Sequence, residues 1–237
     1  MVAKRNSRFL GRLCSDTELG IGTSILASVV PLALPKMKHL VFIDAKAPKS
    51  VIDGVWMHKS NSRVQTYFYD EVADIPGLLS MLGNSKSHLT MYFQTVIDGE
   101  ILDLRSLFRN VPAQGKLFGS MTVFLDDRRG MGKIGPRSLG YLDLMEHHHG
   151  TNFLTDTFKH LKRKVMTIVA GSFFETFGHS GGYITGHAPT IESLTWNTRG
   201  FLFSAPPLPL QATMTNRTIQ LLEEGAFDEM RYRYLVT

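Results

Sequence analysis

The stretch Met121-Thr-Val-Phe-Leu-Asp-Asp127 consists of apolar or β-branched residues followed directly by two carboxylates. An apolar run without polar alternation is typical of a strand that is covered on both faces. Similar short runs, rich in β-branched and aromatic residues, recur along the chain. We therefore predict six strands, at residues 39–44, 64–70, 89–96, 121–127, 165–171 and 182–186.

Stretches with helical spacing lie among these runs, at residues 24–34, 50–58, 75–82 and 103–109, and helical character resumes at 218–224 after a proline-rich break at 204–210. Strands that alternate with helices predict an α/β fold with a largely parallel sheet. Several strands end in a polar or small residue, notably Asp44, Asp126 and Gly171. Ligands bind at the carboxyl ends of strands in such sheets, so we expect the functional site there.

Composition places the chain among ordinary globular proteins. Of its 237 residues, 43% are hydrophobic and 20% are charged, which suffices for a sizeable core. The net charge of +5 comes from short basic clusters that are typical of a solvated surface. The single cysteine, Cys14, favours a reducing compartment. The uncharged run 19–34 contains glycine and proline and is too short to span a bilayer, so we expect a buried helix.

Two motifs suggest chemistry that their context does not support. Residues 130–135 match the dinucleotide pattern GxGxxG, but arginines separate them from the strand and Pro136 follows, so we predict a turn-rich loop. His147-His-His149 lacks the spacing of a helical zinc site, and we predict a polar loop or helix end and no metal. No Gly-x-Ser-x-Gly segment supports a serine hydrolase, and the basic patches lack the aromatics of a nucleic-acid groove.

In order and spacing, a set of segments resembles the α-oxoamine synthase family of fold-type I pyridoxal-phosphate (PLP) enzymes. The resemblance implies the three-layer, mostly parallel large domain of PLP-dependent transferases at residues 19–210. It also implies a basic N-terminal segment at 1–18, the start of a linker helix at 211–237, and an N-terminal anchor and C-terminal small domain that are largely missing. The segments are Ser28-Val-Val-Pro31, Val41-Phe-Ile-Asp-Ala45, Asp98-Gly-Glu-Ile101, Phe124-Leu-Asp-Asp127, Glu146-His147, 171–182 and 200–205.

The same resemblance places Glu175 where the family has its cofactor lysine. A carboxylate cannot condense with an aldehyde to a Schiff base, so catalysis by this chain alone is not expected. Pro48 replaces a histidine that stacks on the pyridine ring, and Arg129 replaces a second histidine. Ser172 belongs to the same degenerate cofactor site.

Asp126 retains the family's aspartate, which pairs with the pyridine nitrogen. From the residues alone, a second interpretation stays open, in which Asp126 is a strand-end carboxylate paired with Arg128 or Arg129. The corresponding interpretation of Glu175 from the residues alone is a side chain that is solvated or ion-paired.

Within the family, the chain most resembles the serine palmitoyltransferase subunits that lack the lysine. This implies a non-catalytic subunit in a heterodimer with a lysine-bearing subunit, which binds PLP and condenses L-serine with a fatty acyl-CoA in sphingolipid biosynthesis. The expected location is the cytosolic face of the endoplasmic reticulum membrane. Two alternatives stay open: an active PLP-dependent acyltransferase that uses Lys133 or Lys164, and a fold relic that acts as a binding module. Residues expected at the shared interface are Gly178, Tyr183, Phe203, Ser204 and Ala205.

Overall fold

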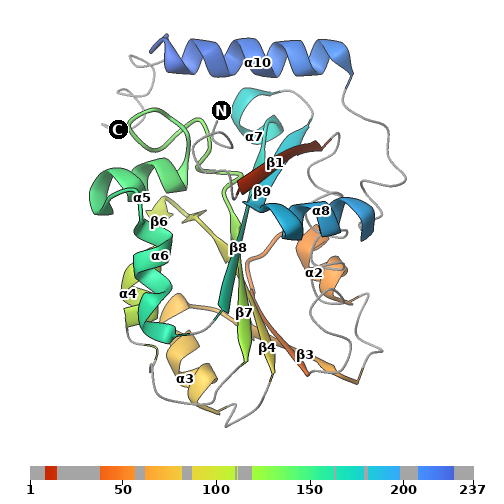
Figure 1. Ribbon diagram of the computed structural model, residues 1–237, viewed down its shortest axis with the longest axis vertical. Coiled ribbons are helices and arrows are strands. Elements are labelled where there is room, and N and C mark those ends of the chain that lie inside the picture. The colour runs from red at the N-terminus through yellow and green to blue at the C-terminus, as the bar shows by residue number, and fades with distance from the viewer. Residues whose placement is uncertain are drawn as a thin grey trace.

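A seven-stranded sheet forms the centre of the computed structural model, which describes residues 9–14, 38–56, 62–81, 87–109, 111, 119–162, 164–178, 181–197 and 208–226 (Figure 1). The strand order is β1-β9-β8-β7-β4-β2-β3. Strands β2, β3, β4, β7 and β8 are mutually parallel, whereas β9 runs antiparallel to β8 and β1 antiparallel to β9. The bounds are β1 Phe9–Cys14, β2 His39–Asp44, β3 Val64–Tyr69, β4 His88–Gln94, β7 Ser120–Asp126, β8 Lys164–Ser172 and β9 Gly182–His187, and a separate pair is β5 Val96–Ile97 with β6 Glu100–Ile101.

The predicted α/β class is confirmed, and all six predicted strands are present with ends within two residues of the prediction. Three predicted helices are also present, and the predicted helix at 24–34 lies outside the described residues. The described helices are α2 Lys49–Trp56, α3 Ile75–Met81, α4 Leu104–Arg109, α5 Tyr141–His149, α6 Phe153–Phe158, α7 Phe174–Phe177, α8 Ala188–Asn197 and α10 Pro209–Glu223, with 3₁₀ turns η3 Val72–Asp74 and η4 Lys159–Leu161.

Helices cover both faces of the sheet, which explains why the strands lack polar alternation. Successive side chains of a strand point to opposite faces. In β2, Leu40 and Phe42 join one buried cluster, which includes residues of α3, α4, α5 and α6. Val41 and Ile43 join a second cluster, which includes residues of α2 and α8. Figure 1 shows these two groups of helices on opposite sides of the sheet.

The C-terminal helix begins earlier than predicted. We expected a proline-rich break at 204–210 and helical character at 218–224, but α10 already starts at Pro209 and ends at Glu223. Proline is tolerated in the first turn of a helix because its missing N–H has no partner there in any case. The side-chain oxygen of Gln211 accepts a hydrogen bond from the backbone N–H of Leu208 at 2.9 Å, which closes this first turn. The predicted domain division at residue 210 stays a prediction.

The described part of the chain contains no helix with both the length and the apolar character that crossing a membrane requires.

Candidate functional site

The site lies where the chain reverses its direction across the sheet. From β2 the chain passes outward to β3 and then returns to β4 on the other side of β2. Such a reversal opens a crevice at the carboxyl ends of the strands, where ligands bind. Asp44 ends β2 and Gln94 ends β4, and the Gln94 amide donates hydrogen bonds to the Asp44 carboxylate at 3.3 Å and to the Lys46 carbonyl at 3.1 Å. These bonds tie the two strand ends together.

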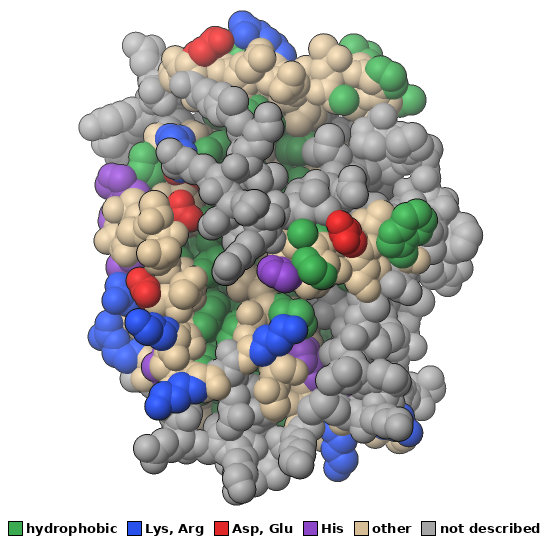
Figure 2. Space-filling view, in the orientation of Figure 1, with side chains coloured by type: hydrophobic (Ala, Val, Ile, Leu, Met, Phe, Trp, Pro, Cys, Tyr) green, Lys and Arg blue, Asp and Glu red, His purple; other side chains and the backbone are tan. Residues whose placement is uncertain are grey.

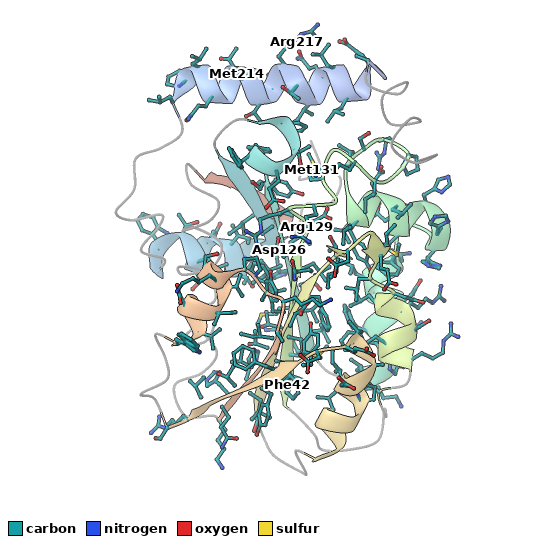
Figure 3. The ribbon with its side chains drawn as sticks, turned by 180° about the vertical axis from the view of Figure 1, so that it is seen from behind. Phe42, Asp126, Arg129, Met131, Met214 and Arg217 are labelled. Atoms are coloured by element: carbon teal, nitrogen blue, oxygen red, sulfur yellow. The ribbon has the colours of Figure 1, made fainter. Side chains whose placement is uncertain are left out.

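Asp126 ends β7 at this edge of the sheet, and its carboxylate is paired within the chain (Figure 3). The Arg128 Nε lies 2.8 and 2.9 Å from the two carboxylate oxygens, and its Nη2 lies 2.6 Å from Oδ2. The Tyr92 hydroxyl donates to Oδ2 at 2.5 Å, and the backbone N–H of Arg128 donates to Oδ1 at 3.2 Å. Of the interpretations that the sequence left open for Asp126, the structure contains the one in which its carboxylate is paired with Arg128.

This ion pair is almost completely shielded from water, because the side chains of Arg128 and Asp126 are only 6% and 2% exposed. Burial alone lowers the pKa of Arg128, but the charge and hydrogen bonds of Asp126 outweigh burial and leave that pKa raised. Burial, followed by the charge of Asp126, raises the pKa of Tyr92 well above its ordinary value. Removing one partner of such a pair costs about 3–5 kcal/mol, since the other charge stays buried and unpaired.

The neighbouring carboxylate, Asp127, has a different environment. Its Oδ1 lies 2.6 Å from the Thr95 hydroxyl, and its Oδ2 accepts the backbone N–H of Tyr141 at 2.9 Å. Burial raises the pKa of Asp127 to about 7, although these two hydrogen bonds act in the opposite direction. Gly130 and Gly140 lie so close to this carboxylate that a methyl group on either would collide with it. Asp127 thus anchors the loop between β7 and α5.

The segment that should carry the cofactor amine follows the end of β8. Ser172 is buried, and its hydroxyl accepts the backbone N–H groups of Phe174 at 3.1 Å and of Glu175 at 3.4 Å, in the first turn of the short helix α7. The Glu175 side chain is exposed to solvent. The Thr176 hydroxyl donates to the Met131 carbonyl at 2.6 Å and so holds α7 against the loop that follows β7.

The other predicted site residues occupy different places. Pro48 immediately precedes α2, and its carbonyl accepts the N–H groups of the helix's first turn. Arg129 is exposed beside the buried pair of Asp126 and Arg128. Gly178 ends α7 with a positive φ of 72°. Phe203, Ser204 and Ala205 lie outside the described residues.

Tyr183, which we predicted at a shared interface, lies on β9 against the chain's own site. Its ring contacts Phe173, with centroids 6.0 Å apart, and lies so close to Gly171 that a methyl group there would collide with it. Burial raises the pKa of Tyr183 well above its ordinary value, and the charges of Asp127 and Asp126 act in the same direction. The role of Tyr183 at an interface stays a prediction.

The two lysines of the alternative enzyme hypothesis are both exposed. Lys164 begins β8 opposite Ser120, whereas Asp126 pairs with Ala170, six residues further along the strand. At about 3.3 Å per residue, this separation is ~20 Å, which is far beyond the reach of a lysine side chain. Lys133 lies in the loop after β7 and is the one of the two that is near the strand ends.

Sequence reasoning found the strand-end carboxylates and named Arg128 as a possible partner of Asp126. It missed the contacts with Tyr92, Thr95 and Tyr141. Tyr92 and Thr95 lie within the predicted strand run 89–96, where nothing in the local pattern separates a site residue from a core residue. Tyr141 contributes a backbone N–H, which no side-chain motif reveals. The register between β4 and β7, in which Gln94 lies opposite Asp126, brings Tyr92 and Thr95 to the site.

Comparison with known proteins finds relatives that are named aminotransferases, 8-amino-7-oxononanoate synthases and a serine palmitoyltransferase, although no protein-family model matches the chain. Aminotransferase FUM8 of Gibberella moniliformis is 37% identical over 198 residues, which is 79% of this chain and 35% of the relative. Aminotransferase ALT4 of Alternaria alternata is 34% identical over 221 residues, 90% of this chain and 27% of the relative. The chain thus spans about a third of these relatives or less.

A serine palmitoyltransferase of Sphingobacterium spiritivorum is 26% identical over 184 residues, which is 77% of this chain and 40% of the relative. Among solved structures, a serine palmitoyltransferase with a PLP internal aldimine superposes with a TM-score of 0.65. It is 18% identical, and the match covers 90% of this chain and 47% of that one. The structural similarity supports the large-domain fold that we predicted.

Proposed function

We propose that this chain is a non-catalytic subunit of an α-oxoamine synthase-type PLP enzyme and supports a lysine-bearing partner. Its similarity to an 8-amino-7-oxononanoate synthase, a serine palmitoyltransferase and a 5-aminolevulinate synthase supports the proposal. The observation that carries the proposal is Glu175. It stands in α7, directly after the end of β8, at the position where the resemblance places the cofactor lysine. An acid at this position supplies no nucleophilic amine for covalent catalysis.

The residues of the chain's own site do not fit the cofactor. A carboxylate offers about four lone-pair positions, and Asp126 already accepts hydrogen bonds from Tyr92 and Arg128 on both of its oxygens. A pyridinium nitrogen would have to displace one of these donors. Pro48 has no aromatic face with which to stack on a ring. We therefore assign PLP to the partner subunit in this proposal.

The chain's contribution would be to assemble with the partner and shape the partner's site. Exposed apolar side chains support an association, because large exposed hydrophobic residues mark interaction surfaces. Trp196 on α8 is 74% exposed, and Leu210 and Met214 on α10 are 70% and 46% exposed. Figure 2 shows exposed hydrophobic side chains over α8 and at one end of α10. We propose these two helices as a contact surface for the partner.

Serine palmitoyltransferase is the enzyme to which we assign the subunit. The complex would condense L-serine with a fatty acyl-CoA in sphingolipid biosynthesis, at the cytosolic face of the endoplasmic reticulum membrane. The similarity to a serine palmitoyltransferase in sequence and to another in fold supports this assignment. In this proposal the heterodimer would reach the membrane through the partner.

A second candidate function has a specific observation in its favour. The identities of 37% and 34% to FUM8 and ALT4 exceed the 26% to the serine palmitoyltransferase, and both proteins bear the name aminotransferase. The partner would then be a lysine-bearing aminotransferase-like enzyme. The two candidates differ in substrate but share the absence of an amine at position 175.

Co-expression with a lysine-bearing homologue from the same source tests the proposal. A tagged form of this chain should retain the homologue on an affinity column, and the pair should release a ketone product from serine and a fatty acyl-CoA. A pair that instead transfers an amino group between substrates supports the second candidate. If the two chains do not associate, the subunit proposal is wrong.

Three variants separate the roles of the chains. Substitution of the partner's cofactor lysine by alanine should abolish turnover while association persists. Glu175→Ala in this chain should leave turnover within about twofold, because an exposed side chain outside the chemistry contributes little. Leu210→Asp should weaken retention of the partner without changing the fold of this chain, since Leu210 is 70% exposed. Turnover by this chain alone would contradict the proposal.

A further inference from the structure

We propose that the guanidinium of Arg128 occupies the Asp126 carboxylate and so prevents a cationic ring ligand from binding there. We further propose that removing this guanidinium allows such a ligand to bind to Asp126. The inference concerns the chain's own site. It holds whether or not the chain pairs with a partner, so its failure and the failure of the subunit proposal give different results.

The shape and charge of the guanidinium support this role. Guanidinium is a flat, delocalised cation with N–H donors along its edge, and a protonated pyridine is a flat cation with an N–H at its edge. Arg128 directs Nε and Nη2 at Asp126, with distances of 2.8 and 2.6 Å to the two oxygens. A pyridinium ring would present its N–H to the same carboxylate. The two cations therefore compete for one anion.

The position of Arg128 in the chain strengthens its ion pair with Asp126. Only one residue separates it from Asp126, so the side chain needs no long loop to return to the carboxylate. Its backbone N–H also donates to the Asp126 Oδ1 at 3.2 Å, which fixes the start of the side chain beside its partner. Both side chains are almost fully buried, and water does not weaken the pair.

The surroundings of the pair suit a flat ring. The Tyr92 ring stacks on Phe124, with centroids 5.7 Å apart and an interplanar angle of 22°. Ala170, which lies opposite Asp126 in the register of β7 and β8, is fully buried and has only a methyl side chain. Sites for small organic ligands are lined mainly by hydrophobic and aromatic side chains with a few placed polar groups, and the residues around Asp126 have this composition.

The matched control is available at the next position. Arg129 is exposed, whereas Arg128 is buried, and a change at either residue removes one positive charge. Arg129→Ala therefore changes the net charge equally but leaves the Asp126 pair intact. Any effect that is specific to Arg128 cannot come from the net charge.

Binding of pyridoxamine 5′-phosphate, followed by its fluorescence, tests the inference. This probe has the pyridine ring but no aldehyde, so it does not react with surface lysines. Arg128→Ala should bind it at least about tenfold more tightly than the wild-type chain and Arg129→Ala do, a difference of about 1.4 kcal/mol. Equal affinity of all three proteins, or no gain in a folded Arg128→Ala protein, would overturn the inference.

A measurement on the wild-type chain covers the case in which Arg128→Ala does not fold. The Nε–H of Arg128 should give a protected NMR signal, assigned by its loss in Arg128→Lys. This signal should stay unchanged when pyridoxamine 5′-phosphate is added. Displacement of the signal by the probe would mean that Arg128 does not close the site, and would refute the proposal.

Discussion

Replacing Asp127 with asparagine should remove the contribution of Asp127 to the pH dependence of stability. The folded chain holds the pKa of Asp127 at about 7, because the side chain is buried. In an unfolded chain an aspartate has a pKa of about 3.9. The folded protein thus binds the Asp127 proton more tightly than the unfolded protein. The stability that this proton contributes is fully present below pH ~3.9 and is lost as the pH rises through about 7.

The geometry around Asp127 explains how the neutral form is accommodated. A protonated Oδ1 can donate to the Thr95 oxygen at 2.6 Å, while the Thr95 hydroxyl donates to the Asp126 carbonyl at 3.2 Å. Oδ2 continues to accept the backbone N–H of Tyr141. Asparagine has nearly the same shape and makes the same two contacts without a proton to lose.

The magnitude follows from the difference between the two pKa values. About three pKa units at ~1.36 kcal/mol each give an upper bound of about 4 kcal/mol. The free energy of unfolding of Asp127→Asn, minus that of the wild type, should therefore increase by up to this amount between pH 4 and pH 8. Urea denaturation followed by circular dichroism, at half-unit pH steps, measures this difference.

The difference between the variant and the wild type must be measured, because His88 also contributes to the pH dependence of stability in both proteins. Burial, followed by the charge of His39, lowers the pKa of His88 to about 4. Stability from neutral His88 is present above the unfolded pKa of about 6.5 and is lost as the pH falls towards 4. This trend opposes that of Asp127 over the same range, so the wild-type curve can be nearly flat. A difference curve that does not change with pH would refute our account of Asp127.

Two further substitutions test the packing of the site. Gly171→Ala places a methyl group against the Tyr183 ring and should destabilise the fold by about 1–3 kcal/mol, whereas Gly77→Ala in α3 meets open space and should be neutral or slightly stabilising. Tyr92→Phe removes the hydroxyl that donates to Asp126 and should cost about 1.5–3 kcal/mol, which urea denaturation would detect. Equal effects of both glycine changes, or no effect of Tyr92→Phe, would contradict the described contacts.

The strands could be predicted because a strand that is buried on both faces consists largely of consecutive apolar residues, which the local sequence shows. Residues 40–43 and 123–125 are apolar without interruption, and helices cover both faces of these strands. The direction of β9 was also accessible in principle. Only nine residues separate Ser172 from Gly182, fewer than the dozen or more that a parallel crossover needs, so β9 returns antiparallel to β8.

The missed elements lacked such local signals. Helix α6, Phe153–Phe158, spans fewer than two turns and has no side-chain hydrogen bond at its N-cap. At the site, the carboxylates were predictable as strand ends, but Tyr92 and Asp126 lie 34 positions apart in sequence. Their contact depends on the register of two strands. Contacts that depend on how strands pair cannot be predicted from patterns among neighbouring residues in the sequence.

The most direct test of the account locates the cofactor. The complex of this chain with its lysine-bearing partner would be treated with borohydride, which fixes a pyridoxyl group on any lysine that has condensed with PLP, and both chains would be examined by mass spectrometry. We predict the adduct on the partner's lysine and none on this chain. An adduct on Lys133, or on another lysine of this chain, would contradict the central claim that it supplies no cofactor amine.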